Sequence, residues 1–416
     1  MSIIKPFKAV RPDPKLADKV AALPYDVMNS EEAREMVVGN PFSFLHIDKA
    51  EIDLPVGTYL YDPVVYAKAK ENFQKAIDEN VFIEEDSPCM YIYAQTMEGR
   101  MQNGLVVCAS IDEYIEGKIK KHELTREDKE LDRIRHVDEL DANTGPIFLT
   151  YRNSAQITDL IAEWKTNNEP VYDFVSEDGI GHTAWIIDDE AAINKLQELF
   201  SEIPVLYIAD GHHRNASAVK VGIRRREANP GYRPDEEFNY YLSVIFPDNE
   251  IRIFDYNRLV KDMNGTTKES LLERLEKVFV VEKQGGPEPF KPQKTHEFGM
   301  YLDSSWYKLT ARSETTDKDD PVAILDVSIL QNYVLAPIFG ISDPRTSKNI
   351  DFVGGIRGLR ELEKRVDSGD SAVAFAMYPT SVEELMNIAD SGQIMPPKST
   401  WFEPKLRSGI FIHKLS

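Results

Sequence analysis

The alternation of apolar and polar positions along the chain predicts interleaved strands and helices. Short apolar runs of strand-forming residues lie at 90–96, 105–111 and 205–209, and each is typical of a β-strand. Apolar residues at helical spacing predict helices over 63–79 and from about 211 to Arg226. Strands and helices that follow one another in this way favour a mixed α/β fold.

Three other patterns make predictions about pairing and turns. The pair Asn103-Gly104 predicts the turn of a hairpin, because Asn-Gly favours tight two-residue loops. The run at 40–46 has the texture of a strand that ends near His46. The runs at 240–246 and 251–254 are expected to pair with each other across a short turn.

The length of 416 residues allows two or three domains, or one elaborated α/β unit. The texture of the sequence changes near residue 260. We therefore expect a core over 1–260 that carries an anion-binding turn, and a C-terminal α/β region over 261–416 that contributes a basic loop.

Composition narrows the class of protein. Apolar residues make up 42% and charged residues 29%, as in soluble globular proteins, and the net charge of −21 argues against general nucleic-acid binding. No stretch approaches the length of a membrane span, and the N-terminus lacks the apolar run of a signal peptide. Two cysteines, Cys89 and Cys108, do not make a disulfide framework. We expect a cytoplasmic protein with reduced thiols, whose partner is a small molecule rather than nucleic acid or membrane; the oligomeric state stays open.

The strongest candidate site follows the apolar run at 205–209. Asp210, Gly211, His212, His213 and Arg214 gather where a strand ends and a helix begins. The N-terminus of a helix offers unpaired N–H groups and a positive dipole end, and an arginine can hold a phosphate through two hydrogen bonds. The pattern predicts a phosphate-binding turn. The alternative is an ordinary helix start with Asp210 as its cap.

A second cluster lies at Lys121-His122-Glu123, in a basic segment of an otherwise acidic chain. His122 and Glu123 suit an acid/base or metal pair, and Lys121 together with Arg133 suits an anion. We expect this cluster to share one pocket with the turn at 210–214. The alternative is a solvated helix start that Thr125 caps.

Asp26 lies on a loop before a helix that begins near Asn29 or Ser30. It is either a turn former or an acid that reaches a substrate hydroxyl or a metal ion.

A proline-rich loop near residue 400 carries a second basic cluster. Its members are Lys398, Ser399, Thr400, Lys405 and Arg407. Together they suit a phosphate clamp, although the glycine spacing of a Walker loop is missing. The alternative is a loop that salt bridges hold to an acidic body.

Two resemblances add to these patterns. The turn Asp210-Gly-His-His-Arg214 resembles the phosphate-gripping turn of the superfamily of ParB, sulfiredoxin and the free serine kinases, in which a Gly-X-X-Arg type turn opens a helix and holds nucleotide phosphates. This resemblance implies a ParB/sulfiredoxin-like nucleotide-binding core with a mixed sheet. It also implies ATP or ADP as the nucleotide, and serine as the natural acceptor.

Over nearly its full length, the chain resembles a prokaryotic family known as domain of unknown function 1015, for which no activity is established. The matching motifs are Lys5-Pro-Phe-Lys-Ala-Val-Arg-Pro12, Pro24-Tyr-Asp-Val27, Lys121-His-Glu123 and Met395-Pro-Pro-Lys-Ser-Thr400.

The anion-binding clusters fit phosphoryl transfer from a nucleotide, with Mg²⁺, to a small hydroxylated metabolite. The resemblance to the free serine kinases implies that this metabolite is serine. Common hydrolase, zinc-protease and dinucleotide signatures are absent. In this interpretation His212, His213 and Arg214 serve the phosphates, and Asp210 or Glu123 serves Mg²⁺ or the hydroxyl. Two alternatives stay open. One is a nucleotide-binding regulatory protein without catalysis. The other is a metal-dependent hydrolase that uses His122, Glu123, His212, His213 and Asp210.

Overall fold

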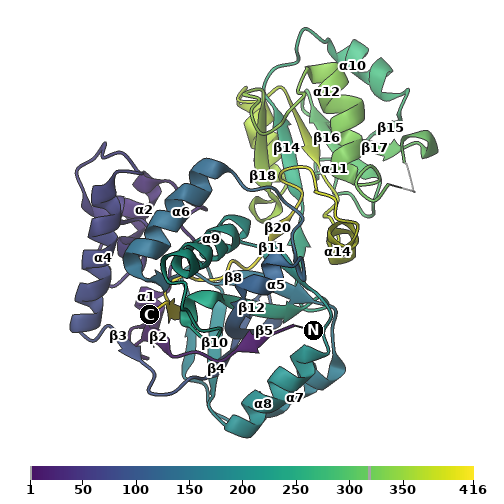
Figure 1. The fold of residues 1–416 in the computed structure, drawn as a ribbon. Helices are drawn as coiled ribbons and strands as arrows, with labels where there is room; N and C mark the ends of the chain where they lie inside the picture. The colour runs from purple at the N-terminus through teal and green to yellow at the C-terminus, as the bar shows by residue number, and fades with distance from the viewer. Residues whose placement is uncertain (1, 317–319) are drawn as a thin grey trace. The chain divides into compact units, whose positions relative to one another are not determined.

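The computed structural model describes residues 2–316 and 320–416, which form two compact units. Residues 1–251 and 404–416 make up the first unit, and residues 252–403 make up the second. Each unit has its own large sheet (Figure 1). The division falls between Ile251 and Arg252, close to the change of texture near residue 260.

Nine of the described strands form the large sheet of the first unit, in the order β6-β11-β8-β12-β5-β4-β10-β9, with β1 beside β5. Their bounds are β1 (Ile4–Lys5), β4 (Met90–Met97), β5 (Arg100–Ser110), β6 (Ile119–Lys120), β8 (Ile147–Tyr151), β9 (Tyr172–Val175), β10 (Gly181–Ile187), β11 (Leu206–Asp210) and β12 (Tyr240–Pro247). β6 and β11 are parallel, as are β8 and β12, whereas the other neighbours are antiparallel. The predicted mixed α/β fold is therefore confirmed.

Helices pack against this sheet and against one another. They are α1 (Ala17–Val20), α2 (Ser30–Met36), α3 (Leu45–Asp48), α4 (Pro63–Asp78), α5 (Ile111–Ile115), α6 (Glu127–Leu140), α7 (Ala155–Asn167), α8 (Glu190–Ser201) and α9 (His212–Ala228). α7 and α8 lie side by side against the sheet (Figure 1), where Ile161 and Leu196 join alternate strand residues such as Val107 and Leu149 in one core. α6 packs along α9.

The first unit also contains a small sheet of four strands. Its strands run in the order β3-β2-β21-β7, with bounds β3 (Phe82–Glu84), β2 (Ala9–Pro12), β21 (Ile412–Lys414) and β7 (Ala142–Asn143). Because β21 lies between β2 and β7, residues 404–416 belong to the first unit although 252–403 separate them from it in sequence.

The second unit contains an antiparallel sheet of six strands in the order β15-β17-β16-β19-β14-β18. Its elements are β13 (Ile253–Phe254), β14 (Tyr256–Val260), α10 (Lys268–Leu275), β15 (Phe279–Lys283), β16 (Glu297–Leu302), β17 (Ser305–Ala311), α11 (Asp326–Leu330), α12 (Ala336–Phe339), β18 (Ile350–Gly354), α13 (Arg360–Asp367), β19 (Val373–Ala376), α14 (Val382–Asp390) and β20 (Trp401–Phe402). A π-helical stretch, Gln331–Leu335, joins α11 to α12.

The hairpin of β4 and β5 turns at a different place from the one predicted. Glu98 and Gly99 form the turn, and both have positive φ angles, of 52° and 77°. Asn103 and Gly104 lie within β5 instead. A Cβ at Gly104 would lie 2.4 Å from Cγ1 of Val244, so this glycine provides room for the side chains of β12 rather than a turn.

We expect Gly104→Ala to destabilise the first unit by about 1–3 kcal/mol, the usual effect of an extra methyl group in a packed core. The new Cβ would also lie 2.6 Å from Cζ of Phe246. Urea unfolding, followed by circular dichroism, measures the effect. The control is Gly231→Ala, where the nearest atom outside the neighbouring residues is Oδ1 of Asn229 at 3.8 Å. Equal urea midpoints of unfolding for the two variants would contradict this prediction and would show that the side chains of β12 move to make room for the added Cβ.

Two further predictions are wrong. The run at 40–46 is not a strand: it leads into the short helix α3, and Phe44 and Leu45 bury their side chains in a core with α4. An apolar run alone does not distinguish a buried helix from a buried strand. The runs at 240–246 and 251–254 do not pair: β12 lies between β5 and β8, and β13 pairs with β20.

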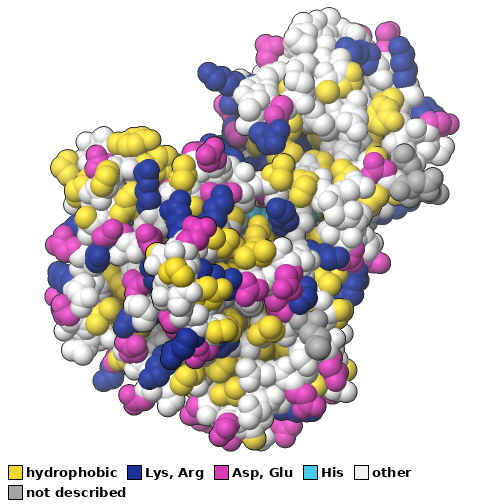
Figure 2. All heavy atoms as spheres, in the orientation of Figure 1, with side chains coloured by type: hydrophobic (Ala, Val, Ile, Leu, Met, Phe, Trp, Pro, Cys, Tyr) yellow, Lys and Arg dark blue, Asp and Glu magenta, His cyan; other side chains and the backbone are white. Residues whose placement is uncertain are grey.

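Other global features limit the classes of protein. None of the helices among the described residues combines the length and apolar character that a membrane span requires. Cys89 and Cys108 are buried free thiols. On the face drawn in Figure 2, acidic and basic side chains are interspersed, so the excess negative charge does not form one continuous patch there.

Candidate functional site

The turn at 210–214 joins a buried strand to a long helix, as the sequence predicts. β11 ends at Asp210, and α9 begins at His212. Gly211 between them has a φ of 90°, a conformation that side chains with a Cβ disfavour. No side chain caps the N-terminus of α9, so its first N–H groups are available to a bound anion.

Arg214 folds back over this turn. Its Nε and Nη2 atoms lie 3.3 Å from the position that a Cβ on Gly211 would take, which is a second reason for glycine there. Nη1 donates a hydrogen bond to the carbonyl of Pro146 at 2.8 Å. Nε is buried and has no hydrogen-bond partner among the described residues. A buried donor without a partner is unfavourable, and an anionic ligand would satisfy it.

Arg214 also lines a small cavity of about 20 Å³, whose wall combines polar side chains with apolar ones such as Val137 and Ile147. Tyr25, Asp48, Arg133 and Thr144 contribute to its wall. Asp48 and Thr144 carry no recognisable motif, and only the fold places them here. The cavity beside the predicted turn is therefore lined in part by residues that the sequence pattern does not single out.

Asp210 is held as a carboxylate. Its Oδ1 accepts from the N–H of Gly211 and its Oδ2 from Nζ of Lys405, each at 3.0 Å. Burial alone would raise the pKa of Asp210, but the charges of Lys405 and Arg214 and these hydrogen bonds lower it to about 2. Lys405 comes from the basic loop near residue 400, so one member of that predicted clamp does reach the turn.

His122 and Glu123 lie beside the same turn. The Nε2 atoms of His122 and His212 are 3.4 Å apart, and the two rings are nearly perpendicular. One ligand atom each from His122, Glu123 and His212 lies within 4.8 Å of the others. The structure thus brings together two clusters that are about 90 residues apart, as expected from the sequence.

Strand topology explains this meeting. β6 ends at Lys120 and β11 ends at Asp210, and the two strands are parallel neighbours. His122 and His212 each follow their strand by two residues, so they lie at the same edge of the sheet. The carboxyl ends of parallel strands are the usual place for ligand-binding residues in α/β proteins.

The histidines at this edge are neutral at pH 7. Burial lowers the pKa of His122 to about 4, and the opposing charge of Asp210 does not restore it. Burial and the neighbouring His122 lower the pKa of His212 well below its ordinary value. Burial also lowers the pKa of His213, whose Nε2 accepts the N–H of Arg126 at 3.0 Å. These three histidines therefore add no positive charge to the attraction of anions by Arg214 and the helix N-terminus.

The other predicted residues have different surroundings. Lys121 is exposed, with Nζ 6.0 Å from the centre of the Tyr114 ring. Arg133 is buried: its Nε bonds Asp132 at 2.9 Å, and its guanidinium lies 3.9 Å from the centre of the Tyr25 ring. Burial alone would lower the pKa of Arg133, but the charges of Asp132 and Asp48 and the hydrogen bond to Asp132 together raise it. Arg133 is thus a structural ion pair in the wall of the cavity.

Asp26 is exposed, on the loop before α2, and its charge opposes the lowering of the His213 pKa by burial. Asn29, not Asp26, caps α2, and Glu32 completes a capping box. Thr125 is not a cap either, because no side-chain cap begins α6 and Thr125 donates to Glu130 instead.

Lys398, Ser399 and Thr400 belong to the second unit. Lys398 is exposed with a φ of 61°, and its carbonyl accepts from Arg258 at 2.9 Å. The hydroxyl of Ser399 donates to Pro396 at 2.6 Å. Arg407, in the first unit, pairs with Asp178. The phosphate clamp of Lys398, Ser399, Thr400, Lys405 and Arg407 stays a prediction.

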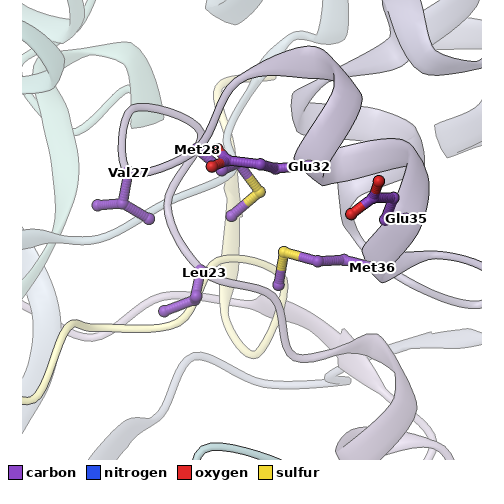
Figure 3. Close-up of a pocket in the computed structure, with 6 residues that line it drawn as sticks. All are labelled: Leu23, Val27, Met28, Glu32, Glu35 and Met36. Atoms are coloured by element: carbon purple, nitrogen blue, oxygen red, sulfur yellow. The ribbon is translucent and has the colours of Figure 1, made fainter. Parts of the chain in front are cut away.

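A separate hollow of about 480 Å³ lies where the loop before α2 meets that helix (Figure 3). Its lining consists of Leu23, Val27, Met28, Glu32, Glu35 and Met36. The side chain of Glu32 extends from α2 towards Met28, whereas the carboxylate of Glu35 stays beside the helix (Figure 3). None of the predicted site residues lines it.

Comparisons with known proteins give one family. The model of the family described as protein of unknown function (DUF1015) matches residues 4–328. A search of curated proteins finds no match.

Solved structures are similar only at a low level. A conserved hypothetical protein from Pyrococcus furiosus is 16% identical, with a TM-score of 0.36 over 74% of this chain and 95% of that one. A free serine kinase in complex with AMP is 15% identical, with a TM-score of 0.36 over 73% of this chain and 91% of that one. SbnI with a C-terminal truncation, from Staphylococcus aureus, is 12% identical, with a TM-score of 0.37 over 73% and 85%.

Proposed function

The chain belongs to the DUF1015 family of proteins of unknown function, and we propose that it is a nucleotide-dependent phosphotransferase that acts on a small hydroxylated metabolite. The observation that carries the proposal is the buried, unpartnered Nε of Arg214 over an uncapped helix N-terminus, with Glu123 beside the same turn. This arrangement combines anion donors with a carboxylate, the two kinds of group that phosphoryl transfer requires.

In this proposal the phosphates of ATP or ADP bind at the start of α9. The backbone N–H groups of His212 and His213 and the guanidinium of Arg214 hold the phosphate oxygens. Lys121, which is exposed, supplies a further cation. Asp210 fits Mg²⁺, because each of its oxygens keeps a lone pair beyond the hydrogen bonds from Gly211 and Lys405.

Glu123 is the proposed general base. It accepts the proton of the acceptor hydroxyl while that oxygen forms a bond to the terminal phosphorus, and the bond from this phosphorus to the bridging oxygen of the nucleotide breaks. The products are the phosphorylated acceptor and a nucleotide with one phosphate fewer. His122 and His212 flank the carboxylate, and burial lowers the pKa of both rings, which makes them weaker proton acceptors than a free imidazole. Serine is the proposed acceptor because the turn at 210–214 resembles that of the free serine kinases.

We expect ATP or ADP with Mg²⁺ to bind one site per chain in titration calorimetry. Incubation with ATP and a panel of hydroxylated amino acids should then yield a phosphorylated product, with serine the best acceptor by mass spectrometry. A parallel titration without Mg²⁺ serves as the control. Absence of heat with every nucleotide tested would contradict nucleotide binding, and binding without any product would contradict phosphotransfer.

A regulatory nucleotide-binding protein is the second candidate. Both oxygens of Asp210 already accept hydrogen bonds from the protein, and this favours a switch because such a carboxylate is a weaker Mg²⁺ ligand. A switch uses the same phosphate contacts but needs no base. Turnover therefore separates the two functions.

A further inference from the structure

We infer that His122, Glu123 and His212 form a three-ligand site for a transition-metal ion of the zinc type. This site is separate from the Mg²⁺ that would accompany a nucleotide. It does not rest on the proposed phosphotransfer but shares Glu123 with it, so Zn²⁺ bound here would occupy the carboxylate proposed there as the base. The three side chains come from the segment after β6 and from the first residue of α9.

The first support is the spacing of the two nitrogens. Nε2 of His122 and Nε2 of His212 lie 3.4 Å apart. Two nitrogens bound to one Zn²⁺ at about 2.0–2.1 Å with tetrahedral angles lie about 3.3–3.4 Å apart. An N–H hydrogen bond is usually shorter, at about 3.0 Å. The pair is therefore spaced as metal ligands are, and is long for a hydrogen bond.

The second support is that both histidine side chains are buried with few hydrogen bonds to replace their hydration. His122 and His212 are only 2% and 6% exposed. Nδ1 of His122 has no hydrogen-bond partner among the described residues. Two buried imidazoles that face each other lose hydration and recover little in the protein alone. A shared metal ion would compensate for this loss, whereas apolar packing alone does not explain two facing ring nitrogens.

Glu123 completes a set of two nitrogens and one carboxylate oxygen. It is half-buried on the segment before α6, and its ligand atom lies within 4.8 Å of both histidine nitrogens. Imidazole ligands favour Zn²⁺ and its neighbours over Mg²⁺, which prefers oxygen alone. Three protein ligands leave a fourth position open to water, as in catalytic zinc sites.

The test uses the full chain, stripped of metal by a chelator and then titrated with ZnCl₂ and, separately, with CoCl₂. We expect one Zn²⁺ per chain, and an intense visible absorption from Co²⁺ in a four-coordinate site. His212→Ala and His122→Ala should each weaken Zn²⁺ binding more than about 100-fold, since even the outer partners of metal ligands contribute about 10–100-fold. Excess Mg²⁺ should not displace Zn²⁺.

His46→Ala is the matched control. His46 is a partly exposed histidine paired with Asp53 at 2.9 Å, and its loss should leave the affinity for Zn²⁺ unchanged. If a histidine variant fails to fold by circular dichroism, Glu123→Gln replaces it, because this change keeps the size of the side chain and should weaken Zn²⁺ binding about 10-fold or more. Unchanged Zn²⁺ affinity in the folded variants, or a weak Co²⁺ spectrum like that of the hydrated ion, would overturn the site.

Discussion

Arg214→Ala is expected to weaken nucleotide binding by about 1.5–3 kcal/mol, which corresponds to roughly 10- to 150-fold in Kd. The variant loses the guanidinium that lies over Gly211, including the buried Nε that has no hydrogen-bond partner among the described residues. Hydrogen bonds from a charged donor to phosphate are stronger than neutral ones, so the loss should fall in this range. Titration calorimetry with ATP and ADP in Mg²⁺ measures it.

Two further variants test whether the loss of affinity is specific to the guanidinium of Arg214. Arg214→Lys keeps the charge but loses the planar fork, and it should recover only part of the affinity. Arg100→Ala removes an exposed arginine at the β4–β5 hairpin and should change nothing. Equal nucleotide affinities for wild type and Arg214→Ala would remove both the phosphotransferase and the nucleotide switch, because both need this contact.

Glu123→Gln is expected to lower kcat by about 10²–10⁴-fold, the usual contribution of a general base. The Kd for the nucleotide should change little, because Gln keeps the shape of the side chain and the phosphates are held by the turn at 210–214. Phosphorylated serine, quantified by mass spectrometry in Mg²⁺ without added zinc, reports the rate, and calorimetry reports the affinity.

Glu127→Gln serves as its control, since Glu127 is an exposed residue in the first turn of α6. Turnover that survives in Glu123→Gln would assign the base to another group. A wild-type protein that binds nucleotide but never turns over would instead support the regulatory function. Loss of nucleotide affinity together with turnover would show that Glu123 acts in binding rather than in proton transfer.

Local patterns predict elements well where one signal dominates. The apolar run that ends at Asp210, followed by Gly211, predicts the strand and the helix that the structure shows. The same rules fail where tertiary packing determines the local conformation. Asn103-Gly104 has the composition of a turn, but Gly104 is needed inside β5 to make room for Val244.

The candidate site depends on both kinds of information. Residue types alone single out His122 and His212, but only the parallel pairing of β6 with β11 places them 3.4 Å apart. Lys405 appears in the sequence as one of several basic residues, and its pairing with Asp210 depends on the return of residues 404–416 to the first unit. Long-range pairing of this kind leaves no local pattern in the sequence.

Because residues 404–416 belong to the first unit, the two units are completed in an unusual order during translation. β21 lies between β2 and β7, and Lys405 balances Asp210, yet both come after all of residues 252–403. The first unit, although most of it is made first, lacks a strand and a charge partner until translation passes residue 414. The second unit is one continuous segment, so all of its strands have been synthesised once translation passes residue 403. Nascent chains of this protein therefore complete their later unit before their earlier one, the reverse of the usual N-terminal-first order.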